Sequence, residues 1–196
     1  MQKLNILLFD GFETLDVFGP VEVFGQLVDQ YDIEYYSEHG GIVVSTQKVH
    51  INTQPLSQLA VNNILFIPGG QGIRREVSNN GLIATIKTLA KASRYVLTVC
   101  TGTALLAKTG LLNNKAATTN KLVFEWVASQ ATEVKWKKSA RWVQDDKYYT
   151  SSGVSAGIDM ALGFIGEMHG LQKAEKIARE IEYVWQQDKE NDPFAV

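Results

Sequence analysis

Cysteine is almost absent from this sequence: Cys100 is the only one among 196 residues, so no disulfide can form within the chain. The chain lacks an apolar run of about 20 residues, which a membrane-spanning helix needs. Its first residues lead straight into an expected strand, without the cleavage region of a secretory signal. Neither sign of charge dominates, with 21 acidic against 19 basic side chains. These absences predict a cytoplasmic protein without membrane or nucleic-acid partners.

Histidine is also scarce, which limits both metal binding and base catalysis. His39, His50 and His169 are scattered, and with one cysteine they offer no metal-ligand spacing. None is near the cysteine in sequence, so each is interpreted as a surface or capping residue. The glycine-rich segment at residues 68–72 has neither a complete dinucleotide fingerprint nor a Walker lysine. We therefore expect chemistry on a small-molecule substrate without a metal ion or a bound cofactor.

The remaining composition is that of an ordinary globular protein. Hydrophobic residues make up 45% and charged residues 20%, and the length is enough for one well-buried core. A continuous apolar run at residues 4–9 indicates a strand buried on both faces, residues 64–67 and 94–99 indicate two further buried strands, and helical periodicity follows them. This alternation predicts a single α/β domain over residues 1–196, with a doubly wound, mainly parallel sheet and helices on both faces.

The other elements are expected from periodicity and from turn residues. Further strands are expected at residues 33–37, 41–46, 48–52, 116–119, 134–136, 142–144 and 148–151. Helices are expected at residues 15–28, 82–90, 101–109, 122–128, 156–168 and 172–185. Thr14 is expected to cap the first helix, and Pro20 to interrupt it.

The one cysteine lies at an abrupt change of hydrophobic period, between a strand ending at Val99 and a helix from Thr101 onward. This is the outline of a nucleophile elbow with half of the usual small-residue pattern, because Gly102 follows Cys100 by two positions whereas Thr98 precedes it. The positive end of the helix would lower the pKa of the thiol and favour the thiolate. The alternative is a buried cysteine that acts only as a small apolar residue.

Other polar and small residues follow strands that would end beside the cysteine, where open α/β sheets bind ligands. Backbone N–H groups of Gly70 and Thr101 could stabilise negative charge in an oxyanion hole. Asp16, in the first turn of its helix, could share a proton with the thiol and act as an acid. The alternatives are that the glycines only turn the chain, that Asp16 only stabilises its helix, or that Glu13 or Glu22 is the acid.

Four segments in this order resemble the ThiJ/PfpI family of the class I glutamine amidotransferase-like superfamily, and in particular its isonitrile hydratase-like branch. They are NILLFDGFETLDVFGPVEVF (5–24), LFIPGGQG (65–72), VCTGTALLAKTGLLNNKAATTN (99–120) and SSGVSAGIDMAL (151–162). The resemblance implies a flavodoxin-like fold, a homodimer, and a site with Cys100 as nucleophile and Asp16 as its acidic partner. It also implies that Gly70 and Thr101 line the oxyanion site, with Gly69 and Asn120 on the substrate side.

Two positions depart from related sequences and distinguish the possible reactions. Thr101 stands where relatives linked to proteolysis carry histidine, which argues against a peptidase. Asn120 stands where many relatives carry histidine, and an amide cannot shuttle a proton, which argues against a glyoxalase- or deglycase-like reaction. The set of Cys100, Thr101 and Asp16 resembles that of an isonitrile hydratase. We therefore expect a lyase that hydrates a small isocyanide-type substrate to an N-substituted formamide.

The alternative function is non-catalytic: a cysteine-based sensor of oxidative stress, or a small-ligand-binding protein. Relatives fused to helix-turn-helix regions support this interpretation. Only residues 188–196 follow the last expected helix, however, which is too few for a DNA-reading module. Direct control of transcription is therefore not expected.

The expected homodimer can be tested by light scattering. At micromolar concentration the protein should have about twice the 21.7 kDa mass of the chain, as in the closed two-fold dimers that are commonest among soluble oligomers. A species of 21.7 kDa alone would contradict the expectation.

Overall fold

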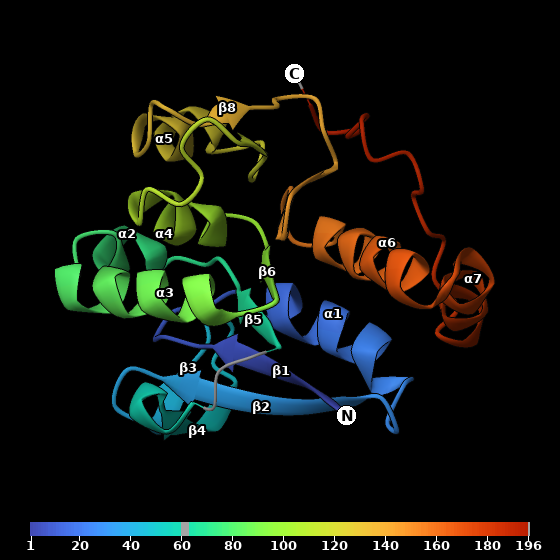
Figure 1. Cartoon of the computed structure of the whole chain (residues 1–196), viewed down its shortest axis with the longest axis horizontal. Coiled ribbons are helices and arrows are strands. Elements are labelled where there is room, and N and C mark those ends of the chain that lie inside the picture. Colours follow the sequence, from blue (N-terminus) through green and yellow to red (C-terminus); the bar gives the residue numbers. More distant parts are fainter. Residues whose placement is uncertain (60–62, 196) are drawn as a thin grey trace.

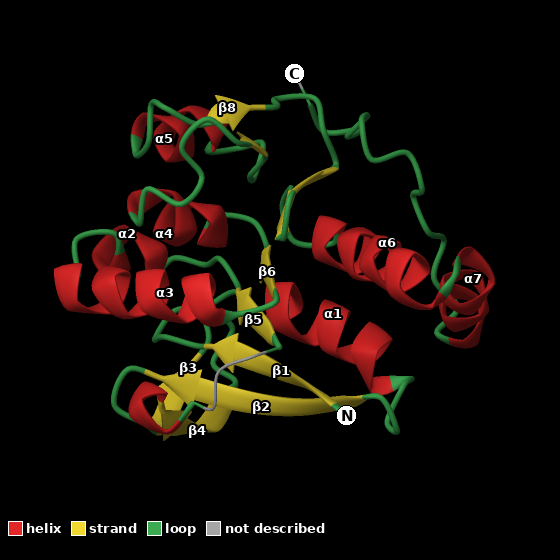
Figure 2. Cartoon of the chain, in the orientation of Figure 1, coloured by secondary structure: helices red, strands yellow, loops and turns green. Residues whose placement is uncertain are grey.

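The computed structural model describes residues 1–59 and 63–195, and a mainly parallel sheet runs through its centre (Figure 1, Figure 2). Among the described residues, the strand order of this sheet is β3-β4-β2-β1-β5-β6-β10-β9. Its strands are β1 Gln2–Leu7, β2 Tyr31–Ser37, β3 Gly41–Val44, β4 His50–Pro55, β5 Ile64–Ile67, β6 Tyr95–Thr98, β9 Trp142–Asp145 and β10 Tyr148–Ser151. The pairs of β3 with β4 and of β9 with β10 are antiparallel, and the other pairs are parallel.

Helices cover both faces of the sheet, with α1, α6 and α7 on one side and α2, α3 and α4 on the other (Figure 1). Their bounds are α1 Thr14–Gly25, α2 Ile73–Glu76, α3 Asn80–Ala92, α4 Gly102–Lys108, α5 Phe124–Ser129, α6 Ala156–His169 and α7 Leu171–Glu180. A small parallel pair, β7 Ala116–Ala117 and β8 Lys135–Trp136, lies near α5. No helix in the described part of the chain is long and apolar enough to cross a membrane. The predicted α/β architecture is confirmed.

The central strands are buried on both faces, as their unbroken apolar sequence predicts. Every residue of β5 is buried, and so are residues 4–7 of β1. Strand β1 pairs with β2 on one side and with β5 on the other. Later strands are therefore added on opposite sides of β1, which makes its edge a topological switch point. Such a switch point opens a crevice at the carboxyl ends of the strands, and this crevice positions the candidate site.

Helix α1 continues through Pro20, so the interruption expected there is wrong. The reason is close packing against α6. A Cβ on Gly19 would lie 2.6 Å from the Ile158 side chain, and one on Gly157 would lie 3.3 Å from the Pro20 ring. Apolar contacts of the buried proline with α6 therefore offset the backbone hydrogen bond that its missing N–H removes.

The ends of two helices also differ from expectation. Thr14 does not cap α1, because its hydroxyl donates to Gln47 Oε1 at 2.6 Å and joins the helix start to the loop between β3 and β4. Helix α7 ends at Glu180 rather than at residue 185. Glu182 adopts a left-handed conformation, φ 51°, and the N–H of Tyr183 turns back to a carbonyl of the last turn. The other expected elements are present, most of them with shifted ends, and α2 and the short 3-10 helix η1 Leu56–Gln58 are additional.

The start of α4 packs directly on the backbone at the end of β5. A Cβ on Gly102 would lie 2.4 Å from the Ile67 carbonyl oxygen and 2.6 Å from that of Pro68. Gly102→Ala should therefore lower the free energy of unfolding by about 1–3 kcal/mol. Gly25→Ala is the matched control, because its Cβ would meet no atom within 4 Å. Urea unfolding measures both, and equal stability of the two variants would contradict this packing.

Candidate functional site

The backbone of Cys100 adopts a left-handed conformation, φ 58°, on the turn between β6 and α4. Residues other than glycine adopt this conformation rarely, and mostly where the surroundings enforce it. Here the N–H of Cys100 donates to the Ser152 carbonyl at 3.0 Å, and its own carbonyl accepts from the Thr119 hydroxyl at 2.8 Å. Loops after two other elements therefore hold the strand-to-helix turn that the change of hydrophobic period predicts.

The side chain of Asn120 contacts the sulfur directly. Its Nδ2 donates to Cys100 Sγ at 3.2 Å, while its Oδ1 accepts from the Leu122 N–H at 2.8 Å and the Val123 N–H at 3.3 Å. Because Oδ1 is bound to these donors, the NH₂ group faces the sulfur. Gly153 leaves room for this arrangement, since a Cβ there would lie 2.5 Å from Asn120 Nδ2.

Asp16, from the first turn of α1, is buried behind the cysteine. Its Oδ2 accepts a hydrogen bond from the Gly69 N–H at 2.8 Å. Its Oδ1 has no partner among the described residues, although it is buried. Burial raises the pKa of this carboxyl to about 7, and the Gly69 N–H and the neighbouring Cys100 side chain oppose the rise. The structure therefore brings Asp16 and Cys100 together, and near neutral pH the carboxyl can hold a proton.

The expectation that the thiol has a lowered pKa is wrong. Cys100 is only 5% exposed, and its burial and the nearby charge of Asp16 raise the pKa of the thiol to about 12. The Asn120 amide and the N–H groups of Thr101 and Val154 oppose the rise but do not outweigh it. In the resting protein the thiol therefore keeps its proton at neutral pH.

The turn after β5 brings two glycines against Thr101. A Cβ on Gly69 would lie 2.6 Å from the Thr101 hydroxyl oxygen and 2.9 Å from Asp16 Oδ2. At Gly70, φ is 134° and a Cβ would lie 2.3 Å from the Gly11 carbonyl oxygen, so both positions require glycine. The Gly70 N–H donates to Thr101 Oγ1 at 3.1 Å. The Gly70 N–H, expected as an oxyanion donor, is therefore engaged by the Thr101 side chain, and the Thr101 hydroxyl keeps its own hydrogen to donate elsewhere.

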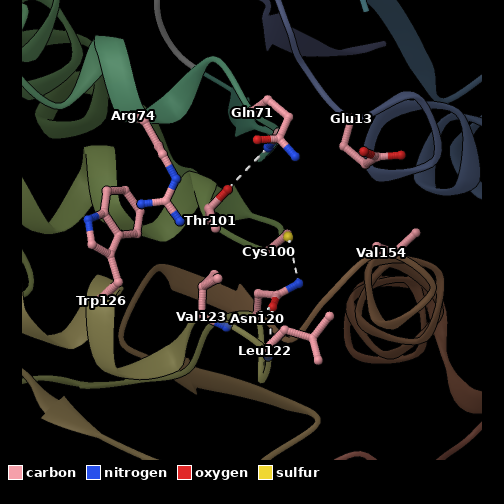
Figure 3. A pocket seen from close by; sticks show the side chains of 11 residues that line it. Glu13, Gln71, Arg74, Cys100, Thr101, Asn120, Leu122, Val123, Trp126 and Val154 are labelled. Atoms are coloured by element: carbon pink, nitrogen blue, oxygen red, sulfur yellow. Dashed lines mark hydrogen bonds between the residues drawn. The ribbon is translucent and has the colours of Figure 1, made fainter. Parts of the chain in front are cut away.

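A cavity of about 270 Å³ opens in front of the sulfur (Figure 3). The residues that line it come from the turns after β1, β5 and β6, from α2, from the segment after β7 with α5, and from the turn before α6: Glu13, Gly70, Gln71, Arg74, Cys100, Thr101, Asn120, Leu122, Val123, Trp126 and Val154. Four residues expected at the site are among them. Asp16 and Gly69 are not, because they form the layer behind the sulfur.

The remaining candidates lie elsewhere, except for Glu13 at the cavity wall. Glu22 is exposed and accepts from the Gln26 side chain. His39 and His50 are exposed, and His169 lies 2.6 Å from the Tyr31 hydroxyl at the end of α6. Among residues 1–59 and 63–195, no group of three or more histidine, cysteine or acidic side chains could hold a metal ion.

Among the cavity residues that were not expected, Arg74 and Trp126 contact each other. The Arg74 guanidinium lies over the Trp126 ring, 4.3 Å from its centroid. Arg74 belongs to α2, which is too short to give a helical periodicity. Trp126 belongs to a helix that is predicted from the sequence. Because it lies only six positions after Asn120, its place near the site could have been predicted.

A cysteine on a strained strand-to-helix turn, facing a cavity at the carboxyl ends of a doubly wound sheet, defines a class of α/β proteins with a nucleophile elbow. The sequence profile of the DJ-1/PfpI family matches residues 2–167. The chain belongs to the DJ-1/PfpI family, which confirms the resemblance in its four motifs.

Individual relatives agree with this assignment. Isonitrile hydratase of Pseudomonas putida is 29% identical over 185 residues, which cover 92% of this chain and 78% of that protein. The HTH-type transcriptional regulator CdhR of Pseudomonas aeruginosa is 26% identical over 192 residues, which cover 91% of this chain and 54% of the regulator. A solved ThiJ/PfpI family protein from Pseudomonas syringae is 26% identical with a TM-score of 0.84, covering 94% of this chain and 76% of that one. The flavodoxin-like fold is thereby confirmed.

The raised pKa of Asp16 makes stability depend on pH. Because the folded protein holds this proton more tightly than the unfolded chain, its stabilising contribution is complete below about pH 4 and is lost as the pH rises to about 7. The free energy of unfolding of the wild type should therefore fall over this range, relative to Asp16→Asn, by on the order of a few kcal/mol. Urea unfolding against pH measures the difference, with Glu22→Gln on the same helix as control. If the free energies of unfolding of the wild type and Asp16→Asn depend on pH in the same way, burial does not raise the pKa of Asp16.

Proposed function

We propose that the protein hydrates a small isocyanide to an N-substituted formamide, with Cys100 as nucleophile and Asp16 as proton donor. The observation that carries the proposal is the buried pair: a carboxyl with a pKa of about 7 beside a cysteine that opens on a cavity of about 270 Å³. This volume is suited to a small molecule. The similarity to isonitrile hydratase over 92% of the chain supports the same reaction.

The reactive form of the pair holds one proton. When Asp16 is ionised, the thiol proton can move to the carboxylate, and the product is a thiolate beside a neutral carboxylic acid. The transfer removes the repulsion between two negative charges, and the Asn120 Nδ2 donor at 3.2 Å then stabilises the sulfur anion. This form is a minor one at rest, but it places a nucleophile and an acid side by side.

In the first half of the reaction, the thiolate attacks the terminal carbon of the isocyanide and a carbon–sulfur bond forms. Asp16 gives its proton to that carbon, so the intermediate is a thioimidate, R–N=CH–S–Cys100. No oxidant or reductant is needed. Addition at carbon suits an isocyanide because this atom accepts both the nucleophile and the proton.

In the second half, water adds across the carbon–nitrogen double bond, with its hydroxyl on carbon and its proton on nitrogen. The carbon–sulfur bond then breaks as the hydroxyl becomes the formyl carbonyl. Its proton returns to the pair, and the product is R–NH–CHO. In this proposal the Thr101 hydroxyl, which accepts from the Gly70 N–H, donates to the oxygen as it develops charge. Gly69 keeps the Asp16 carboxylate in place through its own N–H.

The non-catalytic alternative, a sensor whose cysteine is oxidised by peroxide, finds less support at this site. Oxidation proceeds through the thiolate and is fastest for exposed cysteines of low pKa. Cys100 is buried and the pKa of its thiol is raised to about 12. The hydratase reaction does not need a thiolate in the resting protein, because the thiolate forms by proton transfer to Asp16 when the substrate is bound.

The proposal predicts formamide production from small alkyl isocyanides, detected by NMR. Cys100→Ala should abolish turnover, because no carbon–sulfur bond can form. Asp16→Asn should lower kcat about 100-fold or more, as for the loss of a general acid. Glu22→Gln removes an exposed carboxylate from the same helix and should leave turnover unchanged.

Each variant needs a circular dichroism spectrum like that of the wild type, so that loss of activity is not loss of fold. Formamide release by Cys100→Ala at the wild-type rate would contradict the assignment of Cys100 as the nucleophile. Oxidation of Cys100 by dilute peroxide, with no hydration of any isocyanide tried, would favour the sensor instead.

A further inference from the structure

One end of the cavity carries an arginine whose side chain stacks on an aromatic ring and has no hydrogen-bond or ion-pair partner among residues 1–59 and 63–195. The Arg74 guanidinium stacks on the Trp126 ring at 4.3 Å, and both side chains line the cavity together with Cys100 (Figure 3). Arg74 comes from α2 and Trp126 from α5, so the stack joins the two sides of the cavity. An aromatic face holds the plane of a guanidinium and leaves the N–H groups at its edge available.

The neighbouring Arg75, in the same helix, has a structural role. Arg75 pairs with Glu76, with 2.6 Å between Nη2 and Oε1, and it donates to the Asp10 carbonyl at 3.2 Å. Arg74 has no carboxylate and no carbonyl partner among the described residues. In the described part of the chain, the Arg74 charge therefore contacts only an aromatic ring, whereas that of Arg75 is paired with a carboxylate.

The charges around the cavity are separated. Glu13 lies on the far side of Cys100 from Arg74 (Figure 3), and its Oε1 accepts from Gln47 Nε2 at 2.7 Å. A negatively charged group would thus be repelled at the Glu13 end and attracted at the Arg74 end. Leu122 and Val123 add apolar side chains to the cavity lining.

We propose that the cavity binds substrates that carry a carboxylate, with the carboxylate on Arg74 and the reactive carbon at Cys100. Resting on the proposed function, this makes a small isocyano-carboxylate a better substrate than a neutral alkyl isocyanide. A guanidinium can bind a carboxylate through two parallel N–H donors, which fixes its orientation as well as its position. Trp126 is a positioning residue that holds the plane of Arg74.

The test uses two alkylating agents that form the same S–CH₂ bond with Cys100 and release iodide. Iodoacetate carries a carboxylate, and iodoacetamide carries a neutral amide of nearly the same size. The ratio of the iodoacetate rate constant to the iodoacetamide rate constant measures whether the cavity attracts or repels the carboxylate. A change in the reactivity of the thiol alters both rate constants equally and does not change this ratio. Arg74→Met, which keeps an apolar contact with Trp126, should lower the iodoacetate-to-iodoacetamide ratio about 10-fold, the scale of a lost charge-assisted hydrogen bond.

Arg75→Met is the matched control, because it removes the same charge from the same helix but from a side chain that lines a different hollow beside Asp10. Its ratio should equal that of the wild type. A ratio unchanged in Arg74→Met, or lowered equally in both variants, would overturn the assignment and leave the stack as a link between α2 and α5.

Turnover separates this inference from the function on which it rests. With isocyanoacetate and ethyl isocyanide as substrates, Arg74→Met should raise KM for isocyanoacetate only. An equal rise for both would reject the carboxylate site while hydration itself stands. No hydration of either by the wild type would reject the proposed function, and the alkylation ratio would still decide whether Arg74 binds carboxylates.

Discussion

The left-handed turn at Cys100 is the constraint on which the other features of the site depend. A non-glycine residue at φ 58° must be held from outside, and here the Ser152 carbonyl and the Thr119 hydroxyl hold it. Gly102 adds a third restraint, since it packs on the carbonyl oxygens at the end of β5. The ends of β5, β6 and β10 in the main sheet and of β7 in the small second sheet therefore meet at one point. This places the sulfur between a buried carboxyl behind it and a small cavity in front.

That position has an electrostatic cost. Burial disfavours charge on both Cys100 and Asp16, and Asp16 Oδ1 has no partner among the described residues. A buried oxygen left without a hydrogen bond destabilises the fold. Such local conflicts between stability and chemistry are typical of functional sites. At the cavity wall, Asn120 supplies a hydrogen bond to the sulfur without a titrating group.

Features of the site that depend on chain order were predictable from the sequence, because parallel strands place their following turns at one edge. The strand at residues 64–67 and the hinge at Cys100 are examples. Features that depend on packing were not. The pKa of the thiol follows from its burial and from the charge of Asp16, neither of which is visible in the sequence. The position of Arg74 at the cavity was not predictable, because α2 has only four residues, too few for a periodic pattern.

The central claim is that Cys100 and Asp16 share one proton in their reactive form. The most direct measurement is the rate of alkylation of Cys100 by iodoacetamide against pH, in the wild type and in Asp16→Asn. The wild-type rate should rise through the pKa of Asp16, at about 7, and then level off, because a single ionisation produces the reactive pair. Asp16→Asn should lack this step and become reactive only as the thiol itself ionises. The same step near pH 7 in both proteins would contradict the account.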